Sequence, residues 1–205
     1  MSDRRILVIG GNGTIGSAVV RELSSDHAVQ SSARSTDPSV DLANLESIET
    51  FVGRLTAEPP LEAVVVCAGG GMPGLLDGLD LSSALDAFRP KLLGQIAVAK
   101  AAPRFVRPGG AVVLTSGILD RHPMPGMSHL SMINAAIRAF VGAAATESRP
   151  IRTCAVSPGL VEESPQRVLD FFPGMVRIPA AELAKVYRRL IESGDDGEVA
   201  QYPAD

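Results

Sequence analysis

The stretch Ile6-Leu7-Val8-Ile9-Gly10-Gly11-Asn12-Gly13-Thr14-Ile15-Gly16 decides the fold of this chain. Its apolar start predicts a strand covered on both faces, and the segment 14–23 has the pattern of an amphipathic helix. Gly10, Gly13 and Gly16 lie between the two as G-x-x-G-x-x-G. Such a turn lets the backbone approach a pyrophosphate and points helix N-terminal amides at it. A tight turn that needs glycine for positive φ is the alternative, but the strand–helix context favours dinucleotide binding.

The remainder of the chain alternates between apolar runs and helical patterns. We expect strands at 27–33, 62–68, 111–115, 151–156 and 199–202, a short extended piece around Val40, and helices at 44–55, 82–106, 128–147 and 180–192. Asn44 is a candidate N-cap, and Pro90 is expected to mark a break between two helices. This alternation predicts an α/β fold: a Rossmann-type doubly wound parallel sheet of about six to seven strands with helices on both faces. No repeat or linker interrupts it, so residues 1–205 are expected to form a single dinucleotide-binding domain.

Composition narrows the class of protein further. The 205 residues are 45% hydrophobic and carry a net charge of −4, with 4% aromatic residues and no tryptophan, which argues against a nucleic-acid partner. No apolar run approaches the roughly 18 residues of a membrane span, and no signal peptide is visible. Cys67 and Cys154 are expected to be reduced thiols in a cytoplasmic protein. The three histidines lack the spacing of a metal site, so no metal is expected.

The end of the second expected strand bears on the choice of cofactor. Ligands of parallel sheets lie at the carboxyl ends of the strands, where this chain has Ala33-Arg34-Ser35. An acidic residue there would accept from the ribose 2′-hydroxyl of NAD, whereas an arginine accommodates the 2′-phosphate of NADP. Arg34 and Ser35 therefore favour NADP(H) over NAD(H), unless Arg34 is simply a solvated loop charge. Asp41 and Leu42 are expected beside the adenine.

Several motifs together resemble the short-chain dehydrogenase/reductase family over nearly the whole chain. Gly10–Gly16 is similar to its cofactor turn, and Val40-Asp41-Leu42 is similar to the segment that contacts the adenine. Cys67-Ala68-Gly69-Gly70 is similar to its Asn-Ala-Gly motif, and the run 109–116 to the strand that delivers the catalytic serine. Ser157-Pro158-Gly159-Leu160-Val161 is similar to the loop that holds the nicotinamide carboxamide. The resemblance and the residue patterns give these expected cofactor contacts: Gly10, Asn12, Gly13, Thr14, Ile15, Gly16, Arg34, Ser35, Asp41, Leu42, Ala68, Gly69, Gly70, Lys91, Pro158, Gly159 and Val161.

The family's catalytic pair is missing from this sequence. The resemblance implies a tyrosine, and a lysine four residues later that lowers its pKa, some 13 residues past Ser116. One alignment puts His129 and Ile133 at these positions, and another puts Leu130 and Asn134 there. The chain has two tyrosines (Tyr187 and Tyr202) and three lysines (Lys91, Lys100 and Lys185), all elsewhere.

Three other residues are candidates for the catalytic roles that the missing tyrosine and lysine would have. Ser116 matches the family's serine, although it could be a strand-end serine bonded to backbone. Lys91, in Pro90-Lys91-Leu92-Leu93-Gly94, replaces the asparagine of the family's Asn-Leu-x-Gly segment and could return a positive charge to the cofactor ribose; a surface charge is the alternative. His129 is the candidate for proton transfer, or else an ordinary hydrogen-bonded loop residue.

Three functions therefore remain open. The first is an NADP(H)-dependent oxidoreductase with a rearranged proton-transfer site, acting on a small-molecule carbonyl or alcohol. The second is a non-catalytic NADP(H)-binding sensor or assembly protein, and the third is an isomerisation or dehydration with a structural cofactor. The resemblance implies that the segment 162–177 folds over the substrate as a lid; a loop that packs its own small core is the alternative. It also implies a homodimer or homotetramer through the helical segments 90–106 and 128–147, where small residues would permit close approach or pack on the sheet instead: Ala135, Ala136, Ala139, Gly142 and Ala143.

Overall fold

A parallel six-stranded sheet forms the centre of the computed structural model, which describes residues 4–70, 74–78 and 80–203. The strands are β1 (Arg5–Ile9), β2 (Ala28–Ser32), β3 (Leu61–Val66), β4 (Val106–Thr115), β5 (Arg152–Pro158) and β8 (Val199–Tyr202). Their order is β2-β1-β3-β4-β5-β8, and every neighbouring pair is parallel. The expected Rossmann-type fold with six strands in the sheet is confirmed.

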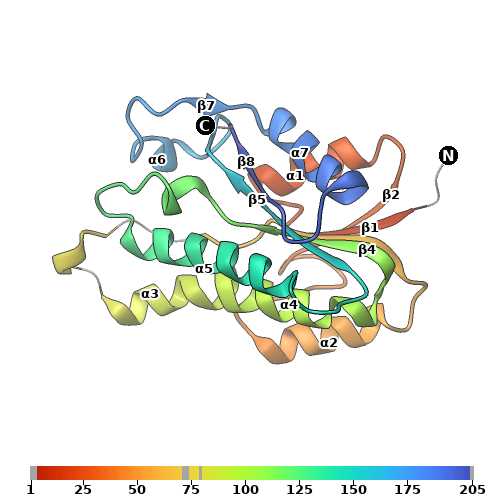
Figure 1. Cartoon of the computed structure of the whole chain (residues 1–205). Helices are drawn as coiled ribbons and strands as arrows, with labels where there is room; N and C mark the ends of the chain where they lie inside the picture. Colours follow the sequence, from red (N-terminus) through yellow and green to blue (C-terminus); the bar gives the residue numbers. More distant parts are fainter. Residues whose placement is uncertain (1–3, 71–73, 79, 204–205) are drawn as a thin grey trace.

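Helices cover both faces of this sheet (Figure 1). They are α1 (Thr14–Leu23), α2 (Leu45–Leu55), α3 (Leu81–Phe88), α4 (Gln95–Ala101), α5 (Ser128–Ala144), the short α6 (Gln166–Leu169) and α7 (Ala180–Ser193). Helices α1 and α7 lie on one face, and α2, α4 and α5 on the other (Figure 1). Side chains alternate along β1 accordingly: Ile6 and Val8 pack in the core on the α1 side, and Leu7 and Ile9 in the core on the α2 side.

One local expectation is confirmed and another needs correction. Pro90 lies between two α-helices, because the segment η2 (Arg89–Gly94) that contains it forms a wider, π-helical turn between α3 and α4. A proline is tolerated at the start of this segment, where its missing N–H costs little. Val40 forms no strand; its N–H donates to the carbonyl of Ala33 within a folded-back loop.

The remaining short elements complete the chain. Three short segments are 3₁₀ turns: η1 (Leu76–Gly78), η3 (Ala102–Arg104) and η4 (Ile118–Asp120). The strand β6 (Leu160–Val161) pairs in parallel with β7 (Arg177–Ile178). Asn44 caps α2 as expected, accepting hydrogen bonds from Glu46 N and Ser47 N. The segment 107–110 forms a bulge inside β4, because Leu61 pairs with Val106 while Ala63 already pairs with Ala111.

Candidate active site

Two cavities lie at the carboxyl ends of the strands and share Gly70. The larger has a volume of about 490 Å³ and is lined by Ile9, Gly10, Asn12, Gly13, Ala33, Arg34, Val40, Asp41, Leu42, Ala43, Cys67, Ala68, Gly69, Gly70, Asp86 and Pro90. The smaller, of about 280 Å³, is lined by Ile15, Gly70, Lys91, Ser116, Gly117, Ile118, Leu119, Leu130, Asn134, Pro158, Gly159, Leu160, Val161, Ser164, Val168, Phe172 and Met175. Parallel sheets of this kind bind ligands at this edge, where the strand order reverses about β1.

The glycine turn after β1 is packed so tightly that side chains cannot enter it. Gly10 has φ +86°, and a Cβ there would lie 2.9 Å from the backbone nitrogen of Ala68. A Cβ on Gly16 would lie 2.1 Å from the carbonyl oxygen of Gly10. Gly13 is the N-cap of α1 and offers no side-chain hydrogen bond, so the first amides of the helix remain available to an anion. These close approaches fit a dinucleotide pyrophosphate at the edge of the larger cavity.

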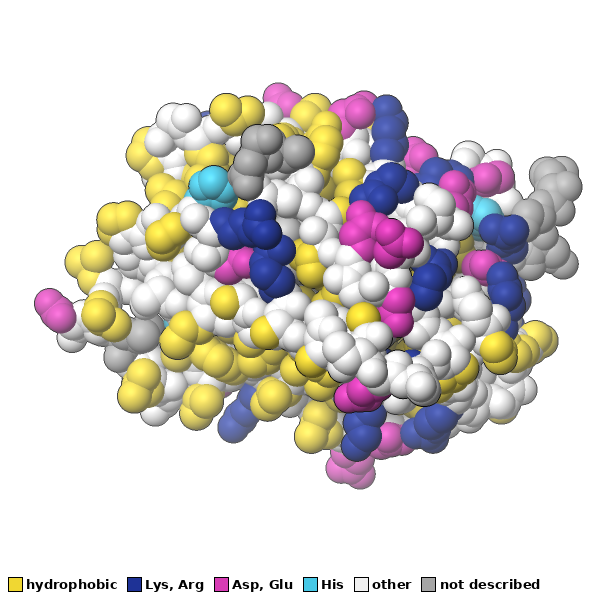
Figure 2. All heavy atoms as spheres, viewed as in Figure 1, with side chains coloured by type: hydrophobic (Ala, Val, Ile, Leu, Met, Phe, Trp, Pro, Cys, Tyr) yellow, Lys and Arg dark blue, Asp and Glu magenta, His cyan; other side chains and the backbone are white. Residues whose placement is uncertain are grey.

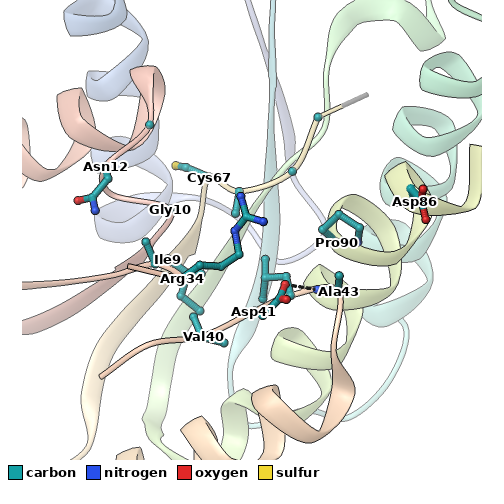
Figure 3. Close-up of a pocket in the computed structure, with 16 residues that line it drawn as sticks. Ile9, Gly10, Asn12, Arg34, Val40, Asp41, Ala43, Cys67, Asp86 and Pro90 are labelled. Carbon is teal, nitrogen blue, oxygen red and sulfur yellow. Dashed lines mark hydrogen bonds between the residues drawn. The ribbon is translucent and has the colours of Figure 1, made fainter. Parts of the chain in front are cut away.

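Arg34 enters this larger cavity from the segment after β2. Figure 3 shows its side chain reaching the middle of the cavity, with Asn12 on one side and Asp86 and Pro90 on the other. It forms no ion pair with the residues that the structure describes. An exposed guanidinium that forms no ion pair with a carboxylate is free to bind a phosphate monoester.

Asp41 and Leu42 also line the larger cavity. Asp41 Oδ1 accepts a hydrogen bond of 3.0 Å from Ala43 N, which leaves its second carboxylate oxygen for a ligand (Figure 3). Leu42 is buried, and its carbonyl oxygen would be 2.3 Å from a Cβ on Gly94. The glycine in η2 therefore lets this helical turn pack directly on the expected adenine segment.

Cys67, Ala68 and Gly69 follow β3 and line the larger cavity. Burial raises the pKa of the Cys67 thiol to about 12, so it is neutral at physiological pH. Gly69 has φ +100°, and a Cβ there would lie 2.7 Å from Cα of Lys91. Only glycine allows the loop after β3 to approach the backbone of Lys91 this closely.

Ser116 lies in the smaller cavity at the end of β4. Its hydroxyl is buried and donates a 3.0 Å hydrogen bond to the carbonyl oxygen of Asn134, on α5. The side chain of Asn134 is also buried, and its Oδ1 has no hydrogen-bond partner in the described part of the chain. A buried carbonyl oxygen without a partner costs on the order of 1–3 kcal/mol, which a bound donor would recover. Ser116 and Asn134 thus form a polar wall in an otherwise largely apolar cavity.

Lys91 is the one ionisable side chain among the described residues that line the smaller cavity. Its Nζ donates to the carbonyl oxygens of Thr115, at 3.3 Å, and Ser116, at 3.1 Å. Burial lowers the pKa of Lys91 from 10.5 to about 8. An ammonium has three N–H donors, so one remains for a ligand.

His129 is not among the described residues that line either cavity. It is 2% exposed, and Ile133, its partner in the first alignment, is fully buried in the core. Leu130 and Asn134 line the smaller cavity instead, so the second alignment describes which face of α5 meets the site. One residue along a helix turns the side chain by about 100°, which moves His129 from the cavity to the core.

Of the other expected cofactor residues, some line the smaller cavity and some line neither cavity. Ile15, Pro158, Gly159 and Val161 line the smaller one, while Thr14, Gly16 and Ser35 line neither. From the segment 162–177, the apolar side chains of Val168, Phe172 and Met175 close over the smaller cavity, as the expected lid would.

Sequence reasoning missed two buried polar residues behind the site. The carboxamide of Gln95 binds the backbone of both Lys91 and Thr115, and the Tyr187 hydroxyl lies 2.8 Å from Thr115 Oγ1. Both lie within apolar helical patterns, so periodicity marks them only as positions on a buried face. Their contacts span 20 and 72 positions in the sequence, which local patterns do not reveal.

A separate acidic cluster lies away from both cavities. Ligand atoms of Asp26, His27 and Glu192 lie within 4.8 Å of one another. Arg188 donates hydrogen bonds to the carboxylates of Asp26 and Glu192, so a guanidinium already neutralises the carboxylates that a cation would bind.

Among the helices of the described residues, none has the length and hydrophobicity of a transmembrane segment.

The fold and the glycine turn after β1 define a Rossmann-type protein. The family model described as enoyl-(acyl carrier protein) reductase matches residues 14–201. The chain therefore belongs to the short-chain dehydrogenase/reductase family, which confirms the resemblance seen in its motifs.

Known proteins extend this relationship over the chain. The structure of lin1944 from Listeria innocua has a TM-score of 0.91 and 31% identity, covering 97% of this chain and 99% of that one. A small-chain dehydrogenase in complex with NADPH has a TM-score of 0.84 and 27% identity, covering 98% and 96%. The PIGF/3-ketodihydrosphingosine reductase fusion protein of Schizosaccharomyces pombe is 28% identical over 163 residues, 66% of this chain and 33% of that protein. The chain thus spans about a third of the length of this relative.

Proposed function

We propose that this protein is an NADP(H)-dependent oxidoreductase that interconverts a carbonyl and an alcohol on a small substrate with an apolar part. The observation that carries the proposal is the contact between Lys91 and Ser116 at the end of β4, on the wall of the smaller cavity, which shares the lining residue Gly70 with the larger cavity. The cofactor's nicotinamide would supply or accept the hydride in this smaller cavity. The apolar side chains around it, such as Leu130, Val168 and Phe172, suit an apolar substrate group.

Ser116, Asn134 and Lys91 would hold the reacting oxygen of the substrate. The hydrogen of Ser116 is directed at the carbonyl of Asn134, so its oxygen presents lone pairs that accept from an alcohol. The third N–H of Lys91 would donate to a carbonyl oxygen. Because its pKa is about 8, Lys91 has both protonation states accessible near neutral pH, so it can release a proton during reduction and take one up during oxidation. This assigns to Lys91 the proton transfer that His129 was expected to perform.

The preference for NADP(H) over NAD(H) is part of the proposal. It is supported by Arg34, whose guanidinium extends into the larger cavity without an ion-pair partner among the described residues (Figure 3). The relative solved with NADPH is consistent with it. The free thiols of Cys67 and Cys154 fit a cytoplasmic location, where cysteines stay reduced.

A cofactor-binding protein without turnover is the second candidate. It is favoured by Leu130, which faces the cavity at the position that aligns with the family's tyrosine and has no proton to transfer. Such a protein would bind NADPH as a sensor or assembly subunit.

One experiment separates the two candidates. NADPH binding is measured by fluorescence, and turnover is measured with a panel of small aliphatic ketones, aldehydes and alcohols. The oxidoreductase predicts that Ser116→Ala binds NADPH like the wild type but loses about 100-fold or more in kcat, the order of magnitude for removing one hydrogen-bonding group at the reacting oxygen. Lys100→Met, which removes an exposed lysine on α4, is the control and should be unchanged. Tight NADPH binding by the wild type without turnover on any member of the panel would favour the sensor.

We also propose a homodimer, in which α3, η2 and α5 face a second copy. Large apolar side chains are exposed there: Leu81, Leu85, Leu93 and Met132. Figure 2 shows apolar side chains gathered over α3 and α5. The exposed small residues Ala135, Ala139 and Gly142 of α5 would permit close helix packing.

A further inference from the structure

The carboxamide of Gln95 makes three hydrogen bonds behind the proposed active site. Its Oε1 accepts from the backbone N–H of Thr115 at 2.9 Å, and its Nε2 donates to the carbonyl oxygen of Thr115 at 3.0 Å and to that of Lys91 at 2.7 Å. Gln95 is fully buried. A buried amide with its hydrogen-bonding capacity used in this way fixes the groups that it binds.

The π-helical turn explains why Gln95 can reach these groups. In a regular α-helix the carbonyl of Lys91 would accept from the backbone N–H of Gln95, four residues later. Here that N–H is bonded to the carbonyl of Leu92 instead, and the side chain of Gln95 takes the carbonyl of Lys91. Wider turns of this kind are frequent at functional sites.

The same strand end holds the ammonium of Lys91. Its Nζ shares the carbonyl of Thr115 with the amide of Gln95 and also binds the carbonyl of Ser116. Gln95 therefore fixes Lys91 at two points. It binds the backbone carbonyl of Lys91 directly, and it binds Thr115, whose carbonyl oxygen accepts a hydrogen bond from Lys91 Nζ. Gly69 and Gly94 complete this frame, because side chains there would collide with Lys91 and Leu42.

We propose that Gln95 is a positioning residue, which holds Lys91 and the end of β4 so that the ammonium of Lys91 lies at the wall of the smaller cavity. The proposal rests on the function proposed above for Lys91, but the arrangement itself can be tested without cofactor or substrate.

The test uses the three lysines of the chain, Lys91, Lys100 and Lys185. The cofactor-free protein is acetylated with trace acetic anhydride over a range of pH, and mass spectrometry gives the rate at each lysine. Lys100 and Lys185 are exposed and serve as internal references. Because only the free amine is acetylated, the quantity compared is the limiting rate constant of the deprotonated amine, obtained from the pH profile of each lysine, and in the wild type this constant should be at least tenfold lower for Lys91 because its side chain is buried. Gln95→Met keeps a similar length but makes no hydrogen bond to the backbone, and we expect the limiting rate constant at Lys91, relative to the reference lysines, to rise at least tenfold.

A second variant guards against loss of folding. Gln95→Glu keeps the shape and the acceptor for Thr115 N, but it adds a carboxylate beside Lys91 and cannot donate to the two carbonyls. We expect the pH midpoint of acetylation at Lys91 to move up by at least one unit, with the reference lysines unchanged, because an opposite charge favours the ammonium. If Gln95→Met does not fold, Gln95→Glu decides alone.

The outcomes distinguish this inference from the proposed function. An unchanged rate and midpoint at Lys91 in the folded variants would overturn the positioning role, whatever the activity. A changed Lys91 in a protein that never turns over substrate would leave the positioning role intact and remove the proposed oxidoreductase. If the positioning role and the oxidoreductase function are both correct, Gln95→Met should lower kcat at least tenfold. The Kd for NADPH should stay within about twofold, since Gln95 lines neither cavity.

Discussion

Lys91 donates a 3.1 Å hydrogen bond to the carbonyl oxygen of Ser116, a contact that joins η2 to the end of β4 across 25 positions in the sequence. The ammonium therefore lies against the backbone of the residue whose hydroxyl lines the smaller cavity. In the family that the motifs indicate, a tyrosine and a lysine on one helix would provide the proton and the charge. In the proposed site the charge would come from Lys91 in η2, and the residues of α5 that line the smaller cavity at the corresponding positions are Leu130 and Asn134.

The pH dependence of the rate should follow Lys91. Because its pKa is lowered to about 8, the ammonium form needed to donate a proton is lost as pH rises. We predict that kcat for carbonyl reduction is flat below pH 7 and falls about tenfold per pH unit above 8. Lys91→Arg keeps the charge but cannot release a proton in this range, so its residual rate should show no such fall. A wild-type rate that stays constant from pH 6 to 10 would exclude Lys91 as the proton donor.

The same group should make the stability of the protein depend on pH. The pKa of Lys91 is about 8 in the folded protein and 10.5 when exposed, so the unfolded chain binds more protons between these values. The free energy of unfolding therefore rises with pH in this window, by on the order of 3 kcal/mol in total. We expect urea unfolding to show this gain for the wild type relative to Lys91→Met between pH 7 and 10.5. Lys100→Met, which removes an exposed lysine, should track the wild type at every pH; a parallel response of Lys91→Met would contradict the assignment.

Cofactor choice should depend on Arg34. Arg34→Ala removes the guanidinium from the larger cavity, so we predict that the Kd for NADPH rises about 10- to 100-fold, the loss of one charge-assisted phosphate contact. The Kd for NADH should change less than about threefold, because NADH lacks the 2′-phosphate. Arg21→Ala is the matched control, since Arg21 is exposed on α1 and lines neither cavity. Calorimetric titration of the three proteins measures both constants, and equal wild-type affinity for the two cofactors would remove the proposed preference.

The parts of the site that follow a strand directly could be predicted from the sequence. Gly10, Arg34 and Ser116 come at strand ends, and the ends of parallel strands meet at one edge, so local patterns place them together. Helix faces were harder. His129 and Leu130 are adjacent, and only packing against the sheet decides which of them faces the cavity. Gln95 was not predicted at all, because its partner Thr115 lies 20 residues away and the wider turn that frees its side chain has no sequence signal apart from Pro90.

The proposed dimer gives the last prediction. Ala139 is exposed on α5, and Ala139→Glu would place a charge in the middle of the small-residue face without affecting the core. Desolvating an unpaired carboxylate in an apolar interface is costly, so we expect the variant to be monomeric at micromolar concentration where the wild type is dimeric. Ala57→Glu, which adds the same charge at an exposed position after α2, should remain dimeric. Light scattering coupled to size exclusion gives the masses directly. A wild-type mass near 21.4 kDa would contradict the dimer, and a dimeric Ala139→Glu would place the interface elsewhere.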